Sequence, residues 1–258
     1  MTVDRVGRRR NANQESEGGT VADSTEMNPL HRHGALPRFD LFRTEHVVPG
    51  IETLLEELDE ALGELEETLE PGEPEETLEP TWAGLVMPLE SISERLGFAW
   101  GLVGHLMGVQ NSDALREAHA ACQSKVVAFG LRLAQSRPLF EGLEALRAGA
   151  GWRSLDAAQQ RIVESLLRDA RHAGVGLEGA ERERFNAIQA ELAELGTRFS
   201  NHVLDATKAY SLVLRDPAEV EGLPESLRAL AAQSAKEEGE AGATAEEGPW
   251  RITLDAPV

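Results

Sequence analysis

One uninterrupted helical pattern runs from residue 180 to residue 214, and it constrains the fold of this 258-residue chain more than any other feature. Successive apolar residues are three or four positions apart, which places them along one face of an α-helix. These residues are Phe185, Ile188, Leu192, Leu195, Phe199, Val203, Ala206, Tyr210 and Val213. At ~1.5 Å of rise per residue, such a helix would be roughly 45–50 Å long. We therefore expect a long helix over 180–212 and a mainly α-helical protein.

Shorter amphipathic segments lie on both sides of this helix. We expect them to form helices at about 45–70, 82–109, 113–135, 138–148, 155–173 and 224–235. Thr44 is the expected cap of the first helix and Ser154 of the fifth. The second contains glycines at 97, 101, 104 and 108, which weaken it locally or allow another helix to approach closely.

The pattern changes from helix to strand after Tyr210. Residues 211–214 favour a strand, and residues 250–256 alternate apolar and polar side chains. The two segments could pair as a short antiparallel sheet, which would be marginal alone. The chain stops at Val258, directly after the second strand. We therefore expect an incomplete fold from which polypeptide is missing.

Three segments lack such patterning. Residues 1–26 are polar and are expected to form a disordered arm, with Met27 as a plausible alternative start. The pentapeptide Glu-Thr-Leu-Glu-Pro occurs at 67–71 and again at 76–80, which we interpret as a duplication that lengthens a loop. Residues 233–248 are rich in Ala, Glu and Gly, and we expect them to be flexible.

The net charge is −20, and most of it is local. Residues 52–79 hold 13 acidic and no basic residues, so a solvated acidic helix face is favoured over a site for a cation or a basic partner. This acidity argues against nucleic-acid binding, which needs a basic surface. No apolar run approaches the ~18 residues that cross a bilayer, and no signal peptide is evident. We expect a cytoplasmic protein that binds neither nucleic acid nor membrane.

No residue of the sequence is a candidate for a catalytic, cofactor-binding or metal-binding role. None of the seven histidines is followed by Glu, so the zinc motif H-E-x-x-H is absent from these residues, and hydrolase and nucleotide motifs are absent too. His31 with His33, and Asp169 with His172, are better explained as solvated pairs than as metal ligands. The single cysteine, Cys122, fits a buried apolar position in a reducing compartment.

Several short strings are more specific in sequence than a helical pattern alone requires. They are 28–30 (Asn-Pro-Leu), 37–40 (Pro-Arg-Phe-Asp), 45–49 (Glu-His-Val-Val-Pro), 80–82 (Pro-Thr-Trp), 88–90 (Pro-Leu-Glu), 199–207 (Phe-Ser-Asn-His-Val-Leu-Asp-Ala-Thr), 222–226 (Gly-Leu-Pro-Glu-Ser) and 252–257 (Ile-Thr-Leu-Asp-Ala-Pro). In this order they resemble the N-terminal part of the oligopeptidase A members of the thimet oligopeptidase and neurolysin family of zinc metallopeptidases. The resemblance spans about 27–258. His202 departs from it, since the family commonly has a second Asn there.

The resemblance implies a multi-helix, neurolysin-like N-terminal region. It implies an N-terminal helical domain over 27–152 and the start of the peptidase domain over 153–258, truncated before the zinc motif. In the family, two helical halves enclose a channel that admits short peptides, and zinc lies at its base. The resemblance thus implies a cytosolic zinc metalloendopeptidase, monomeric at full length, of which this chain would form part of the channel wall.

Two hypotheses follow. In the first, the chain is an N-terminal fragment of such a peptidase, binds no catalytic zinc and cleaves nothing alone. In the second, it is a stand-alone, non-catalytic helical module that binds peptides or, through 52–79, a basic partner.

Overall fold

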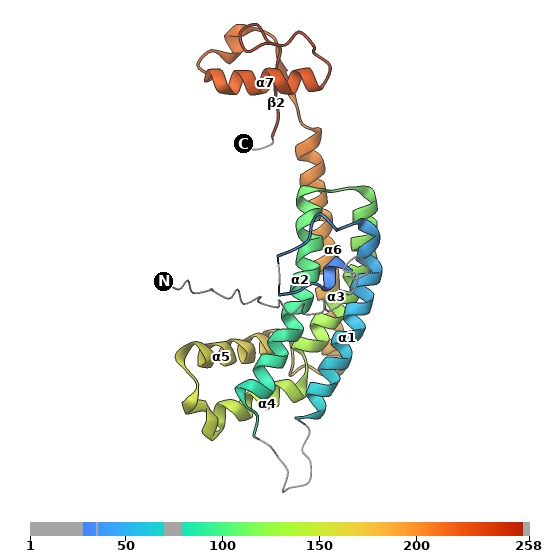
Figure 1. Cartoon of the computed structure of the whole chain (residues 1–258), viewed down its shortest axis with the longest axis vertical. Coiled ribbons are helices and arrows are strands. Elements are labelled where there is room, and N and C mark those ends of the chain that lie inside the picture. The colour runs from blue at the N-terminus through green and yellow to red at the C-terminus, as the bar shows by residue number, and fades with distance from the viewer. Residues whose placement is uncertain (1–27, 35, 70–78, 255–258) are drawn as a thin grey trace, which may run out of the picture.

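The computed structural model describes residues 28–34, 36–69 and 79–254, and within them the protein is mainly α-helical, as the sequence predicts (Figure 1). The helices are α1 (Val47–Glu67), α2 (Met87–Val109), α3 (Asp113–Ala134), α4 (Arg137–Ala148), α5 (Ala157–His172), α6 (Gly179–Ala209) and α7 (Glu225–Glu237). The strands are β1 (Leu212–Leu214) and β2 (Trp250–Ile252). The expected disordered arm, the start at Met27, most of the duplicated loop and the last residues of the second strand lie outside the described residues.

A single apolar core holds α1 to α5 together. Its buried residues form a stripe along α1 and continue on α2, α3, α4 and α5. On α1 the stripe comprises Ile51, Leu54, Leu58 and Leu62, each at most 1% exposed. Because full burial of one such side chain is worth about 1.5–3 kcal/mol, this stripe contributes strongly to the stability of the bundle. Val163 of α5 belongs to the same core, so this core extends beyond residue 152. The division of the chain at 152–153 stays a prediction.

The segment before α1 is pinned to the start of that helix. The Asn28 side chain accepts a hydrogen bond from the backbone N–H of Leu30 (3.0 Å) and donates one to the carbonyl of His46 (2.8 Å). A Cβ atom at Gly50 would lie 2.3 Å from the Asn28 amide, so the close approach requires glycine. Leu30, 1% exposed, fills the core beneath this contact. The resembling string 28–30 therefore has a structural role.

Two expected helix caps are wrong. Thr44 lies inside a 3-10 turn (Thr44–His46) that leads into α1, and its side chain caps nothing. Asp156, not Ser154, caps α5: its carboxylate accepts from the backbone N–H groups of Ala158 and Gln159, both at 2.8 Å. Asp competes well with Ser at this position because a carboxylate also matches the positive end of the helix dipole. The side chain of Ser154 instead donates to the carbonyl of Gly151 (2.7 Å).

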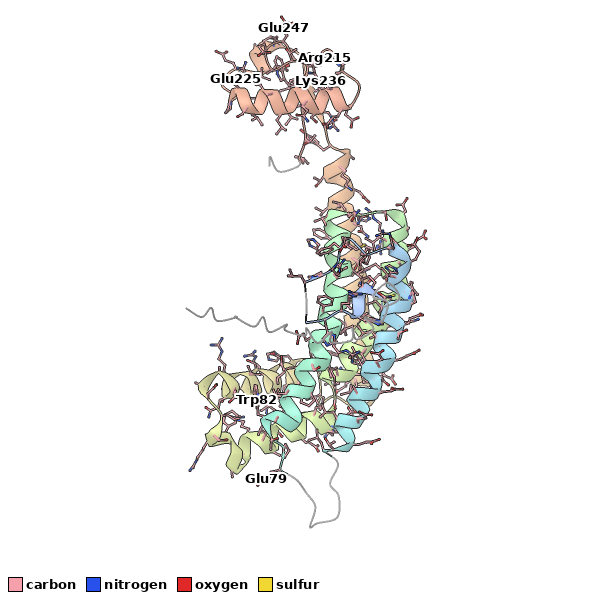
Figure 2. All side chains as sticks on the ribbon, viewed as in Figure 1. Glu79, Trp82, Arg215, Glu225, Lys236 and Glu247 are labelled. Atoms are coloured by element: carbon pink, nitrogen blue, oxygen red, sulfur yellow. The ribbon has the colours of Figure 1, made fainter. Side chains whose placement is uncertain are left out.

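Helix α6 leaves the bundle and ends in a small C-terminal unit (Figure 1). There β1 and β2 pair antiparallel, as predicted, with Val213 opposite Arg251. A second core, separate from that of the bundle, lies between this sheet and α7 and surrounds Trp250, which is fully buried. Figure 2 shows Arg215, Glu225, Lys236 and Glu247 in this unit, at the opposite end of the molecule from Glu79 and Trp82.

The segment 233–248 is more ordered in structure than we expected. Helix α7 continues through its first part to Glu237, and Ala243 is fully buried in the second core. Thr244 and Gly248 exchange two backbone hydrogen bonds of 3.0 Å. The indole N–H of Trp250 donates to the carbonyl of Ala245 (3.2 Å). Composition alone suggested a flexible linker, but the buried tryptophan provides a centre around which these small residues pack.

Candidate functional site

Near the start of α6, polar side chains connect this helix to the end of α3. Gln135, which follows α3 and is 3% exposed, donates from Nε2 to the carbonyl of Ala173 and to Oδ1 of Asn186, both at 2.8 Å. Its Oε1 accepts from Nε of Arg182 (2.9 Å). The side-chain amide of Gln135 thus makes three hydrogen bonds. Through them the residue connects the end of α3, the end of α5 and α6.

Two further contacts continue this connection along α6. Gln123 donates from Nε2 to the carbonyl of Ala193 (2.8 Å) and to Oγ1 of Thr197 (2.7 Å). Near the other end, Arg116 forms a bidentate ion pair with Asp205 (2.9 and 2.5 Å). The pairing lowers the pKa of Asp205 and raises that of Arg116, because each charge stabilises the other through hydrogen bonds. Helix α6 is thus attached to the bundle largely by polar side chains.

The apolar face of α6 that the sequence predicts is present, but the described residues do not cover it. No residue of α6 is buried. Phe199 is 70% exposed and Leu192 56% exposed, and the other exposed members of the face are Ile188, Leu195 and Val203. Tyr210 and the β1 residues Leu212 and Val213, which follow the helix, are exposed too. A row of exposed apolar side chains along one helix face is typical of a surface that packs against another surface.

A groove of about 710 Å³ lies between α2, α3 and this face of α6; we call it the α2–α6 groove. Its walls include Gly104, Met107 and Gly108 on α2 and Leu192, Phe199 and Val203 on α6. Gly97 and Gly101 extend the glycine face of α2, and all four glycines are exposed with no atom within 4 Å of an added Cβ. Each glycine destabilises a helix by roughly 0.5–1 kcal/mol relative to alanine. The four glycines therefore lower the stability of α2, unless another segment packs closely against them.

His119 on α3 also lines the α2–α6 groove. Its ring stacks on that of Trp100 at a centroid distance of 4.4 Å, and the residue is only 8% exposed. Burial lowers its pKa, so the neutral imidazole is favoured. Its Nδ1 is buried and has no hydrogen-bond partner among the residues that the structure describes. The sequence alone assigns no role to His119, because one histidine within a helical stripe carries no distinguishing signal.

The histidines and acidic residues considered as ligands make other contacts. His31 contacts the carbonyl of Gly50 through Nε2 (2.7 Å), and His33 lies in an exposed turn. Asp169 pairs with Arg168 (3.0 Å), and His172 is exposed at the end of α5. Cys122 is fully buried, as expected, and burial raises the pKa of its thiol.

The acidic face of α1 is partly neutralised from within the bundle. Glu52 pairs with Lys125 (2.5 Å), Glu57 pairs with Arg95, and Arg132 lies 3.2 Å from Asp59 and from Glu66. These cations come from α2 and α3, the neighbours of α1 in the bundle. The expectation of an acidic helix face thus has a structural explanation that needs no basic partner.

The described residues do not fit a zinc ion. Nowhere in 28–34, 36–69 and 79–254 do three His, Cys, Asp or Glu side chains come together in a way that could hold a metal. We therefore derive no zinc-dependent step from this part of the chain. The helices that the structure describes are also too short or too polar to cross a membrane.

Comparison with known proteins defines the class. The family model for the N-terminal domain of neurolysin and thimet oligopeptidase matches residues 51–182, about half of the chain. The chain therefore belongs to the neurolysin and thimet oligopeptidase family, and its resemblance to the N-terminal part of oligopeptidase A is confirmed.

The relatives narrow this further. The chain is 43% identical over 235 residues to the probable cytosolic oligopeptidase A of Arabidopsis thaliana, covering 91% of this chain and 32% of that protein. It is 44% identical over 238 residues to the organellar oligopeptidase A of the same plant, covering 92% and 29%. It is 35% identical over 230 residues to oligopeptidase A of Escherichia coli, covering 89% and 32%. The chain thus spans about a third of the length of these relatives.

Proposed function

We propose that this chain serves as the N-terminal helical part of an oligopeptidase A-like metallopeptidase that hydrolyses internal bonds of short peptides. In this proposal the bundle and α6 form part of one wall of the substrate channel. The zinc ion and the catalytic groups belong to polypeptide outside these residues. The boundary at 152–153 separates the N-terminal helical domain from the first part of the peptidase domain.

The uncovered face of α6 is the observation that carries the proposal. A helix of 31 residues presents a row of apolar side chains that nothing in the described structure buries. Each such side chain is worth about 1.5–3 kcal/mol when it is fully buried. Relatives about three times as long have more polypeptide with which to bury this face. A helix exposed on one side and tied by polar contacts on the other suits a wall between two parts of a larger enzyme.

We propose a cytosolic location for this enzyme. The relative named as a probable cytosolic oligopeptidase A is 43% identical to the chain, although an organellar form is equally similar. The buried, unpaired Cys122 suits a reducing compartment. A green fluorescent fusion of the chain, compared with soluble and organellar markers, tests this location.

Peptide cleavage by the purified 258-residue chain tests the division of labour. A quenched fluorescent oligopeptide incubated with the chain and added zinc is expected to stay intact. Cleavage that a chelator abolishes would refute the proposal that the catalytic groups lie elsewhere. A folded chain that binds peptides tightly without cleavage, through residues other than those of the α6 face, would instead support the stand-alone binding module.

A further inference from the structure

The α2–α6 groove combines three features that the bundle itself does not use. One wall is the exposed glycine face of α2, the other is the apolar face of α6, and His119 lies between them with its Nδ1 unpartnered among the described residues. Each feature is unfavourable for an isolated domain: glycine weakens the helix, apolar surface meets water, and a buried polar atom lacks a hydrogen bond. All three meet at one place, which indicates that a partner occupies it.

We propose that the α2–α6 groove is the docking site for one amphipathic helix, supplied by the polypeptide that the longer relatives possess beyond the segment aligned with this chain. The inference rests on the proposed function and specifies which surface joins the two parts of the enzyme. The docked helix would place its apolar face against Leu192, Phe199 and Val203. Its backbone would approach α2 at Gly104 and Gly108.

The shape of the groove favours a helix as the occupant. Helices pack at interaxial distances of about 8–10 Å, and the shortest of these need small residues at the contact. Gly97, Gly101, Gly104 and Gly108 follow one another at spacings of four, three and four, so they form one narrow face of α2. An added Cβ atom at each would have no atom within 4 Å, so the space in front of α2 is free.

The extent of the apolar face disfavours a short peptide as the occupant. From Ile188 to the end of α6 at Ala209 the face is roughly 30 Å long at ~1.5 Å per residue. A partner that covers the whole face is therefore a long, ordered segment. Charge disfavours a second copy of the chain, because two chains of −20 each repel one another.

His119 adds a requirement for the partner. Because Nδ1 is buried and unpaired in the described structure, the docked helix is expected to bring a polar side chain to it, such as Ser, Thr, Asn or Gln. An amphipathic helix with one such residue on its apolar face, opposite His119, would cover the groove and supply the missing hydrogen bond. The polar residue would also fix the register of the docked helix, since a displaced helix would leave both groups unpaired.

Co-expression tests the inference with the full chain. The affinity-tagged 258-residue chain is produced together with the polypeptide that follows the aligned segment in the cytosolic Arabidopsis relative, and captured material is quantified. Gly104→Leu fills the groove, and Gly63→Leu is the matched control. Gly63 lies inside α1, away from the groove, and also has no atom within 4 Å of an added Cβ. Both changes favour the helical state, so neither is expected to prevent folding.

The wild-type chain and Gly63→Leu are expected to capture the second polypeptide equally, and Gly104→Leu to capture about tenfold less, which corresponds to a loss of about 1.4 kcal/mol of binding. Phe199→Ser is expected to lose capture too, whereas Leu230→Ser on α7 retains it. Equal capture by Gly104→Leu and Gly63→Leu would overturn the inference, as would the absence of capture by the wild-type chain. A dimer of the chain alone that Gly104→Leu dissociates would overturn it as well, since a second copy would then fill the groove.

A fused polypeptide separates failure of this inference from failure of the proposed function. The chain is joined directly to the same second segment, and hydrolysis of a quenched peptide is measured for the wild type and for Gly104→Leu. If Gly104→Leu leaves hydrolysis unchanged, the result would contradict docking of a helix in the α2–α6 groove and would support the proposed function. A folded fusion without hydrolysis would contradict the proposed function, whatever the capture experiment shows.

Discussion

Arg116 and Asp205 form a two-pronged ion pair that fastens the first turn of α3 to the last part of α6, with oxygen–nitrogen distances of 2.9 and 2.5 Å. Nε of Arg116 also donates to Oδ1 of Asn111 (2.6 Å), and the Asn111 amide donates to the carbonyl of Met107 at the end of α2 (2.6 Å). One guanidinium thus links three helices close to the α2–α6 groove.

Acid should weaken this link. Because Arg116 lowers the pKa of Asp205 in the folded chain, the pair stabilises the fold above the ordinary Asp pKa of about 4, and this contribution is lost as the pH falls further. We expect Asp205→Asn to be less stable than the wild type at pH 7 and the gap to narrow below about pH 4. Urea unfolding followed by circular dichroism measures both, with Glu221→Gln as a control outside the helix pair. A gap independent of pH would contradict the prediction.

Gln135 should be important for the stability of the α3–α6 contact. Its side chain satisfies a backbone carbonyl and two polar side chains at a position that is 3% exposed. Gln135→Ala is expected to lower the free energy of unfolding by about 1–3 kcal/mol, since it leaves partly buried polar groups without partners. Gln233→Ala on the exposed face of α7 should change it by less than about 0.5 kcal/mol. Equal effects in the two variants would show that the contact contributes little.

His119 should make the bundle sensitive to mild acid. Burial lowers its folded-state pKa below the ordinary value of about 6.5, so the unfolded chain takes up the proton first as the pH falls. Stability should therefore decrease as the pH drops below about 6.5. His119→Phe retains an aromatic ring on Trp100 without a titratable group, and we expect its stability to fall less between pH 7.5 and 5.5. Parallel urea titrations of the two proteins would contradict the prediction if their pH dependence were the same.

The C-terminal unit should depend on Gly248. Its φ is +70°, and an added Cβ atom would lie 2.7 Å from the ring of the buried Trp250. Gly248→Ala is therefore expected to destabilise this unit by about 1–3 kcal/mol. Gly242→Ala, where an added Cβ atom meets nothing within 4 Å, is the matched control. Hydrogen exchange at 250–252 reports the effect locally, and equal protection in both variants would show that the contact is unimportant.

Periodicity predicted the helices well, because the spacing of apolar residues reports directly on which face of a helix is apolar. The long helix expected at 180–212 is α6, Gly179–Ala209, and the strand pair forms between the expected segments. Periodicity does not report which surface meets that face. The apolar residues of α6 lie on one face as the spacing predicts, yet Phe199 is 70% exposed, because no described residue covers it.

The polar contacts of α6 were beyond prediction from one sequence. Gln123 and Arg116 on α3 and Gln135 directly after it occur among other polar residues, and nothing in their spacing distinguishes them from solvated side chains. The glycine face of α2 was recognised as a place where another helix could approach, but only the structure shows that it is open and joins the apolar face of α6. The two cap predictions were wrong for a local reason: Thr44, Ser154 and Asp156 are all residue types that cap helices well, so the sequence does not show which one does so.

Replacing the N-terminal part of a relative tests the central claim most directly. Residues 27–258 are substituted for the aligned segment of the cytosolic Arabidopsis relative, and hydrolysis of a quenched oligopeptide is followed with and without a chelator. If the chain is the N-terminal part of an oligopeptidase A-like metallopeptidase, the chimera will cleave the peptide and the chelator will abolish cleavage, while the 258-residue chain alone stays inactive. A chimera that folds but does not cleave would contradict the account.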